Sequence, residues 1–469
     1  MTSHPTGDEL SQPTPPTEES PSSYIPGRLL HRSFTHHPAS VLSAKASTLF
    51  LSDGRSILDA CGGAAVATIG HGHPSVLDAI SRQAQDVSYV HTQAFTTPAA
   101  EDLANLLLEG QPGGLDMAFF VGSGSEAVEA AMKLARQWHF ERGETQRVHF
   151  VARQQGYHGN TMASMSLSSN VARKIPYQGF SYPHVTHVSP PFAYRYQRDA
   201  ESEEDFTNRL VQEVEDEFLR IGTDKVIAFV GETVIGATAG CVTPPKGYWA
   251  GVQAVCQKYG ILLILDEIMC GSGRCGAPFA FLQEDVQPDI VTVAKGLGGG
   301  YAPIAGVLMN RKVTDVIRNG SGAFVHGHTY QAHPLSCATA LEVQKVIRRE
   351  NLISQCAQMG KLLEELLRRE IGGLKSVGDI RGRGLFWAVE FVQDKNTKAP
   401  FDPKIGFGVK VQQDAFERGV AIYPGAGTID GRRGDHVLLA PPFNITRGEL
   451  ETVVEVLRES IMSQEALHG

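Results

Sequence analysis

Short apolar runs alternate with helix-like stretches from about residue 29 onward. The strand-like runs are AFFVGSG (118–124), RVHFVAR (147–153), VIAFVGE (226–232), ILLILDEIM (261–269) and DIVTVAK (289–295). Helix-like stretches include residues 125–142 and 246–260. Short apolar strands separated by helices predict a mostly parallel sheet that helices cover on both faces, which is the α/β class.

The pattern changes after about residue 335. A long helix-like stretch at 334–371 is followed by the strand-like run IRGRGLFWAVEFV. A further helix is predicted at 404–418, and an amphipathic helix at 447–462 closes the chain. This order predicts a separate, smaller α+β domain at the C-terminal end.

Residues 1–28 are rich in Pro, Ser and Thr and poor in apolar side chains. They therefore predict a disordered tail, because too little apolar surface is present to offset the entropy of ordering. The tail has no apolar core of a secretory signal. It carries four acidic residues and no arginine before Arg28, which disfavours a mitochondrial presequence. No apolar run reaches about 18 residues, so no membrane span is expected.

Length, net charge and cysteine content limit the number of domains, the kinds of partner and the cellular compartment. The 469 residues suggest two or three domains. The 42 basic and 51 acidic residues give a net charge of −9, which argues against nucleic acid or an anionic membrane as the main partner. The seven cysteines form no C-x-x-C pair, so neither a zinc knuckle nor a disulfide framework is indicated. A reducing, cytoplasmic compartment is the simpler interpretation.

A glycine–serine segment follows the first of these strands and opens a helix. Ser123, Gly124 and Ser125 are small, so backbone N–H groups and hydroxyls can approach an anion there. The helix N-terminus adds its partial positive charge. The alternative is a helix cap with a glycine turn.

Two charged residues end later strands. Asp266 ends ILLIL at the predicted carboxyl edge of the sheet, where α/β proteins bind ligands. A buried carboxylate there is costly unless it meets a cation; a solvated loop acid is the alternative. Lys295 follows VTVA and precedes the glycine-rich run 296–300. Partial burial would favour the neutral amine that a Schiff-base lysine requires, whereas a lysine that extends into solvent is the alternative.

Aromatic and histidine-bearing segments complete the candidates. Tyr157 lies beside a glycine, and such an aromatic residue is suited to stack on a flat ring. The alternative is a tyrosine that packs within a turn. His326, His328 and His333 lie close together in the sequence, but no matching carboxylate pattern supports a metal. A hydrogen-bonding loop is favoured, and no metal site is predicted.

The order of these weak signals carries more information than each one alone. An anion loop, an aromatic residue, a strand-end acid and a lysine follow one another along the chain. Together they provide what a pyridoxal phosphate site requires: a phosphate cradle, a ring stack, an acid for the pyridinium nitrogen and a lysine for the aldehyde.

The motifs resemble those of class III aminotransferases, in the fold type I group of pyridoxal phosphate enzymes. The similarity extends from about residue 45 to 460 and includes IGHGHPSVLDAI, FFVGSGSEAVEAAMKLAR, YHGNT, LILDEIMCGSGRCG, DIVTVAKGLGGGYAPIAGVL and GHTYQAHP. It implies an enzyme that moves an amino group from an amine or amino acid to an oxo acid, aldehyde or ketone. It also implies a large domain at 75–335 and a small domain formed by 29–74 and 336–469.

The resemblance assigns roles residue by residue. Lys295 matches the lysine that forms the internal aldimine, and Asp266 the acid that keeps the ring nitrogen protonated. Ser123, Gly124 and Ser125 match the phosphate loop, and Tyr157 the ring stack. The further cofactor contacts are His158 beside Tyr157, Glu232 near the ring hydroxyl, Ile268 on the opposite ring face, and Thr329. Because Thr329 matches a threonine that reaches the neighbouring subunit's phosphate, a homodimer with shared active sites is implied.

Departures from the family pattern concern the substrate. Asn160 stands where ornithine- and GABA-type members have arginine, and Tyr423 where amine:pyruvate-type members have one. Arg432 and Arg433 could bind a carboxylate instead, or face solvent. Ala65 stands near the position of a frequent tryptophan, which predicts a wider pocket and a bulkier or less charged amino donor.

Other functions are compatible with the same fold. A racemase, aminomutase, decarboxylase or lyase would use the same cofactor without passing the amino group to a separate acceptor. A non-catalytic binding protein is disfavoured by the intact pair of Lys295 and Asp266.

Overall fold

The computed structural model describes residues 28–33 and 38–468. The tail predicted for residues 1–28 lies outside these ranges, apart from Arg28. Residues from Val41 onward form one compact unit. The described residues before Val41 contain no helix or strand. The division into a large and a small domain stays a prediction.

A seven-stranded sheet forms the centre of this unit. Its strands, in spatial order, are β4 (Leu115–Val121), β10 (Ala305–Asn310), β9 (Ile290–Val293), β8 (Leu262–Asp266), β7 (Val226–Glu232), β5 (His149–Arg153) and β6 (Val185–Val188). The strands from β9 to β6 are parallel, and β10 is antiparallel to both of its neighbours. The predicted mostly parallel sheet is confirmed.

Strand β8 shows why these segments are apolar throughout. Leu263 and Leu265 pack into the hydrophobic cluster on one face of the sheet, whereas Leu262 and Ile264 pack into the cluster on the other. Side chains alternate across a strand, so a strand covered on both faces is apolar at every position.

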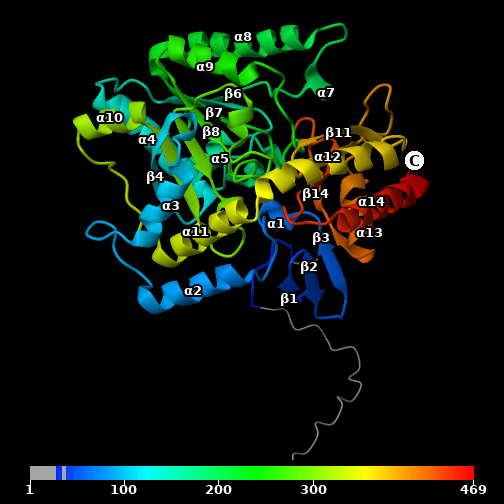
Figure 1. Cartoon of the computed structure of the whole chain (residues 1–469). Helices are drawn as coiled ribbons and strands as arrows, with labels where there is room; N and C mark the ends of the chain where they lie inside the picture. The colour runs from blue at the N-terminus through cyan, green and yellow to red at the C-terminus, as the bar shows by residue number, and fades with distance from the viewer. Residues whose placement is uncertain (1–27, 34–37, 469) are drawn as a thin grey trace, which may run out of the picture. The chain divides into compact units, whose positions relative to one another are not determined.

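Helices cover both faces. One face is covered by α3 (Pro98–Leu108), α8 (Glu203–Ile221), α9 (Tyr248–Lys258) and α11 (Pro334–Arg349). The other is covered by α4 (Gly124–Glu141), α5 (Met162–Leu167) and α10 (Arg311–Asn319). In Figure 1, α8 and α9 lie side by side at the top of the view.

The two ends of the unit build the smaller sheets. One contains β1 (Val41–Lys45), β2 (Thr48–Leu51), β3 (Ser56–Asp59) and β13 (Val420–Ala421); the other contains β11 (Val377–Arg383), β12 (Phe386–Phe391), β15 (Asp435–Leu439) and β14 (Tyr423–Ala426). Because β13 pairs with β3, segments far apart in sequence share a sheet. Helices α12 (Leu352–Glu370), α13 (Phe407–Glu417) and α14 (Arg447–His468) pack into one core cluster with β11, β12 and β15.

The helix-like stretch predicted at 334–371 consists of two helices. Helix α11 ends at Arg349 and α12 begins at Leu352. Asn351 between them has φ 55°, in the left-handed region. A right-handed helix cannot continue through such a residue, and asparagine adopts this conformation more readily than most residues.

The remaining elements are short or peripheral. They are α1 (Gly62–Ala65), α2 (Pro74–Asp86), α6 (Val171–Lys174), α7 (Ala193–Tyr196) and the 3₁₀ turns η1 (Pro112–Gly114), η2 (Ile175–Tyr177), η3 (Thr223–Lys225), η4 (Ala280–Gln283) and η5 (Lys295–Leu297). Among the described residues, no helix is both long and apolar enough to cross a membrane.

Candidate active site

The carboxyl ends of the parallel strands bring the predicted residues to one edge of the central sheet. Glu232 at the end of β7 lies directly opposite Asp266 at the end of β8, and Asp266 lies opposite Thr292 on β9. Lys295 follows three residues after Thr292. Such an edge is where α/β proteins place their ligands.

Asp266 is buried and held by two donors. It is 3 % exposed, and its Oδ2 lies 2.8 Å from Nδ1 of the buried His158. The Ile268 N–H donates to Oδ1 at 3.0 Å. A carboxylate only accepts hydrogen bonds, so Nδ1 of His158 carries the proton. Histidine and aspartate therefore form a fixed pair at the floor of the site.

Glu232 orients the segment that carries Tyr157. Its two carboxylate oxygens accept from the Tyr157 N–H at 3.0 Å and the Gly236 N–H at 2.8 Å. Burial raises the pKa of Glu232, partly offset by His158. The carboxylate thereby joins the loops that follow β5 and β7.

Lys295 has a conformation and a pKa unusual for lysine. Its φ is 45°, in the left-handed region that non-glycine residues seldom adopt. Burial lowers the pKa of its amine, and the carboxylates of Glu232 and Asp266 oppose this shift. A lowered pKa increases the neutral, nucleophilic fraction of the amine.

The first turn of α4 forms a narrow cradle. Ser123 caps the helix by accepting from the Glu126 N–H at 3.3 Å. A Cβ on Gly124 would lie 2.9 Å from Cδ1 of Ile268, and a Cβ on Gly159 would lie 2.7 Å from Oγ of Ser125. Both positions therefore favour glycine. The first turn of a helix carries backbone N–H groups without intrahelical acceptors and a partial positive charge, which a phosphate requires.

The loop around Thr329 lies beside this cradle. Nε2 of His328 lies 3.0 Å from Oε1 of Glu126 in the first turn of α4. Thr329 itself is exposed, and its carbonyl accepts from the Tyr89 hydroxyl at 3.0 Å. The histidine loop therefore forms hydrogen bonds. Among residues 28–33 and 38–468, no group of three His, Cys, Asp or Glu side chains could hold a metal ion.

Comparisons with known proteins now decide the family. The class-III aminotransferase family model matches residues 31–461. The chain belongs to the class-III aminotransferases. An uncharacterized aminotransferase of Schizosaccharomyces pombe is 47 % identical over 93 % of this chain and 95 % of its own. An aminotransferase of Gibberella zeae is 41 % identical over 93 % of this chain and 86 % of its own. The omega transaminase of Pseudomonas jessenii, solved in complex with PMP, superimposes with a TM-score of 0.88 at 32 % identity and covers 94 % of this chain and 98 % of its own.

The predicted substrate residues of this class-III aminotransferase fall into three groups. Ala65 and Tyr423 belong to one apolar cluster with Met269 and Cys270, a few residues beyond Asp266. Their predicted place near the cofactor site stays a prediction. Asn160 is linked to the cradle instead: its Oδ1 accepts from Oγ of Ser125 at 2.8 Å, and its N–H donates to the same oxygen at 3.0 Å.

Arg432 and Arg433 lie on the loop Gly427–Gly434 and are exposed. Arg433 pairs with Asp430 at 2.7 Å, within the same loop. Gln155 anchors the loop by donating to the Thr428 carbonyl at 2.9 Å. The loop that carries both arginines is therefore held against the segment that leads to Tyr157.

Sequence reasoning gave no role to Glu267. Its carboxylate accepts from the N–H groups of Ala280 and Phe281 at 2.7 and 2.6 Å, and from the Thr233 hydroxyl at 2.9 Å. Burial raises the pKa of Glu267 to about 7. Its place directly after Asp266 was the signal, but only the fold brings its three donors together.

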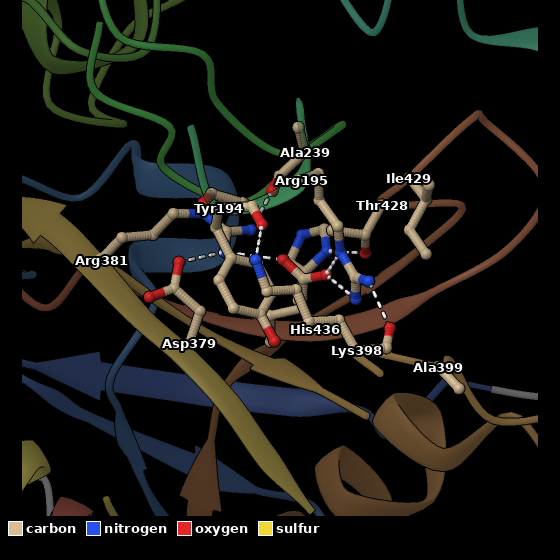
Figure 2. A network of polar contacts seen from close by, with 12 residues as sticks. Tyr194, Arg195, Ala239, Asp379, Arg381, Lys398, Ala399, Thr428, Ile429 and His436 are labelled. Carbon is tan, nitrogen blue, oxygen red and sulfur yellow. Dashed lines mark hydrogen bonds and ion pairs between the residues drawn. The ribbon is translucent and has the colours of Figure 1, made fainter. Parts of the chain in front are cut away.

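An ion network also escaped sequence reasoning. The fully buried Glu390 pairs with both Arg195 and Arg381, and Arg381 also pairs with Asp379 at 2.8 Å. Arg381 donates to the Gly240 carbonyl at 2.6 Å. Figure 2 shows Arg195, Asp379 and Arg381 near Thr428 and His436, which are hydrogen-bonded to each other and flank Arg432 and Arg433 in the chain. The network ties the loop after Glu232 to β11 and β12.

Proposed function

We propose that this class-III aminotransferase uses pyridoxal 5'-phosphate to pass an amino group from an amine or amino acid donor to a carbonyl acceptor. The residues present fit this cofactor. The cradle of Ser123, Gly124 and Ser125 suits its phosphate, Asp266 its ring nitrogen and Lys295 its aldehyde carbon. When bound, pyridoxal phosphate supplies a carbonyl carbon and an electron-accepting ring for amino-group transfer.

The protein's own groups would hold the ring and move the proton. Asp266, fixed by His158, would keep its negative charge next to the protonated ring nitrogen. Tyr157, Ile268 and Glu232 would orient the ring. Nζ of Lys295, with its lowered pKa, is suited to take a proton from the donor carbon and to return it.

One observation carries the proposal. A buried carboxylate ends β8 at the carboxyl edge of the parallel strands, and a lysine with a lowered pKa follows the end of the neighbouring strand β9. Both lie near the N-terminus of α4, which packs against Ile268. A buried negative charge needs a cationic partner, and a protonated pyridine ring would be such a partner for Asp266.

The assembly and location are proposed as well. Val325 and Tyr330 are exposed and lie close to Thr329 in the chain, and the exposed Tyr89 contacts the same loop through the Tyr330 ring and the Thr329 carbonyl. Large apolar side chains that stay exposed in one chain are often covered at a subunit interface, which supports a homodimer in which Thr329 serves the neighbouring site. All seven cysteines are free and buried, which supports a reducing, cytoplasmic setting.

The test is a half-reaction titration. The purified protein is loaded with pyridoxal phosphate, and the cofactor absorption band is followed while single amines are added. The panel spans α-amino acids, ω-amino acids, diamines and apolar amines, with Lys295→Ala as the control. The proposal expects some amines to convert the cofactor to pyridoxamine phosphate and an oxo acid to restore it. If amines release product while the cofactor is never converted, the protein catalyses another pyridoxal reaction and the proposal is wrong.

A further inference from the structure

Arg173 is a cation at the candidate site that sequence reasoning did not identify. It lies on the short helix α6, exposed, with its guanidinium carbon 5.4 Å from the centre of the Tyr157 ring. Across the described chain, its side chain forms no ion pair, and its backbone N–H donates to the Asn170 side chain that caps α6. The guanidinium is therefore free to bind an anion beside the residue predicted to stack on the cofactor.

The helix that carries Arg173 is anchored by its neighbour. Nζ of Lys174 donates to the carbonyls of Ser166 and Ser168 at 3.2 and 2.8 Å. Burial lowers the pKa of Lys174. Of the two adjacent basic residues, Lys174 anchors α6 through these hydrogen bonds, whereas Arg173 is exposed and lies over the Tyr157 ring.

Helix α6 also adjoins the loop Gly427–Gly434. A Cβ on Gly431 would lie 3.1 Å from Cγ2 of Val171, so the two segments touch. Of the loop's two arginines, Arg433 pairs with Asp430 through its side chain, whereas Arg432 contacts Asp430 through its backbone N–H. Asn160, at the position where related enzymes have arginine, is occupied by Ser125. Arg173 is thus a cation placed over Tyr157 that no carboxylate within residues 28–33 and 38–468 engages.

We propose that Arg173 binds the substrate's carboxylate, so that the preferred donor or acceptor carries a carboxylate group remote from its reacting carbon. This inference rests on the proposed function. A planar guanidinium forms two parallel hydrogen bonds to a carboxylate. The Tyr157 ring, whose centre lies 5.4 Å from the guanidinium carbon, attracts the charge and favours its position there.

The experiment compares donors that differ only in the carboxylate. Holoenzyme is assayed by the half-reaction with β-alanine against propylamine, γ-aminobutyrate against butylamine, and ε-aminocaproate against hexylamine. Arg173→Leu should lower kcat/KM for the carboxylated member of the preferred pair by about tenfold to a hundredfold, and for the matching alkylamine by less than about threefold. Arg173→Lys should retain part of the preference, because it keeps the charge but loses the fork. Arg447→Leu, which removes an exposed arginine of α14, is the matched control and should change neither value.

A binding measurement separates this inference from the proposed function. Valerate, a carboxylate that cannot react, is titrated calorimetrically into wild-type and Arg173→Leu holoenzyme. Weaker binding to the variant, by about tenfold or more, supports the site even if no amine converts the cofactor. Equal binding to both proteins, or an equal loss of activity toward carboxylated and uncarboxylated donors, overturns it.

Discussion

Replacing Asp266 by asparagine tests the centre of the proposed site. The substitution keeps the volume of the side chain but removes its charge and one acceptor. The Ile268 N–H, 3.0 Å from Oδ1, needs the amide oxygen. The amide NH₂ would then face Nδ1 of His158, which lies 2.8 Å from Oδ2.

Two donors would oppose each other unless His158 moves its proton to Nε2. In the described structure that nitrogen is buried without a hydrogen-bond partner. The loss of one charge-assisted hydrogen bond costs about 1.5–3 kcal/mol. Asp266→Asn would also remove the negative charge that supports a protonated ring nitrogen. Removal of one such electrostatic group typically lowers kcat by about 100- to 1000-fold. We therefore expect Asp266→Asn to lower kcat by two to three orders of magnitude while cofactor still binds.

The assay measures kcat and KM on protein fully loaded with cofactor, and the cofactor Kd by equilibrium dialysis. Asp289→Asn is the matched control. Asp289 is also buried, accepts from the Leu263 N–H at 2.9 Å and pairs with Lys312 at 3.0 Å, but it lies at the opposite edge of the sheet, before β9. It should reduce stability and change kcat by less than about threefold. An Asp266→Asn protein with wild-type kcat at full cofactor occupancy would show that another group supports the ring nitrogen.

Three further predictions concern the lysine, the neighbouring glutamate and the ion network. Lys295→Ala should keep the circular dichroism spectrum of the wild type and lose turnover; turnover at the wild-type rate would contradict its assignment. Burial raises the pKa of Glu267 from 4.5 to about 7, so the stabilisation of the folded state that this shift brings is complete below about pH 4.5 and is lost as the pH rises through 7. Thermal unfolding from pH 4 to 8 should show a fall in stability that Glu267→Gln lacks, and parallel curves would refute it. Glu390→Gln should lower the free energy of unfolding by about 3–5 kcal/mol, because it leaves Arg195 and Arg381 buried without their shared carboxylate; denaturant titration measures this, and a cost below about 1 kcal/mol would contradict it.

Local sequence determined the elements that carry the chemistry. The strands that end at Glu232 and Asp266 are apolar at consecutive positions because helices cover both faces of their sheet, and that signal is readable without any tertiary contact. Ser123 before a helical stretch is likewise a local cap signal, and the structure places it there. The family motifs, which rest on the same local segments, predicted the class that the comparisons show.

Residues whose role depends on a distant partner could not be assigned in this way. Glu267 looks like any acid after a strand until η4 and Thr233 supply its donors. The helix-like stretch predicted at 334–371 is divided at Asn351, whose left-handed backbone no helical periodicity reveals.

The substrate side shows the same division most clearly. The resemblance predicted that Asn160 stands where some class members have arginine, and the sequence shows that Arg432 and Arg433 are near in the chain to Tyr423. Only the tertiary structure decided that Asn160 pairs with Ser125, that Arg433 pairs with Asp430 and that Arg173 lies over Tyr157. Hydrophobic periodicity reports which face of an element is buried, whereas the partner of a charged side chain depends on loops that meet across the fold, and these contacts leave no periodic trace in the sequence.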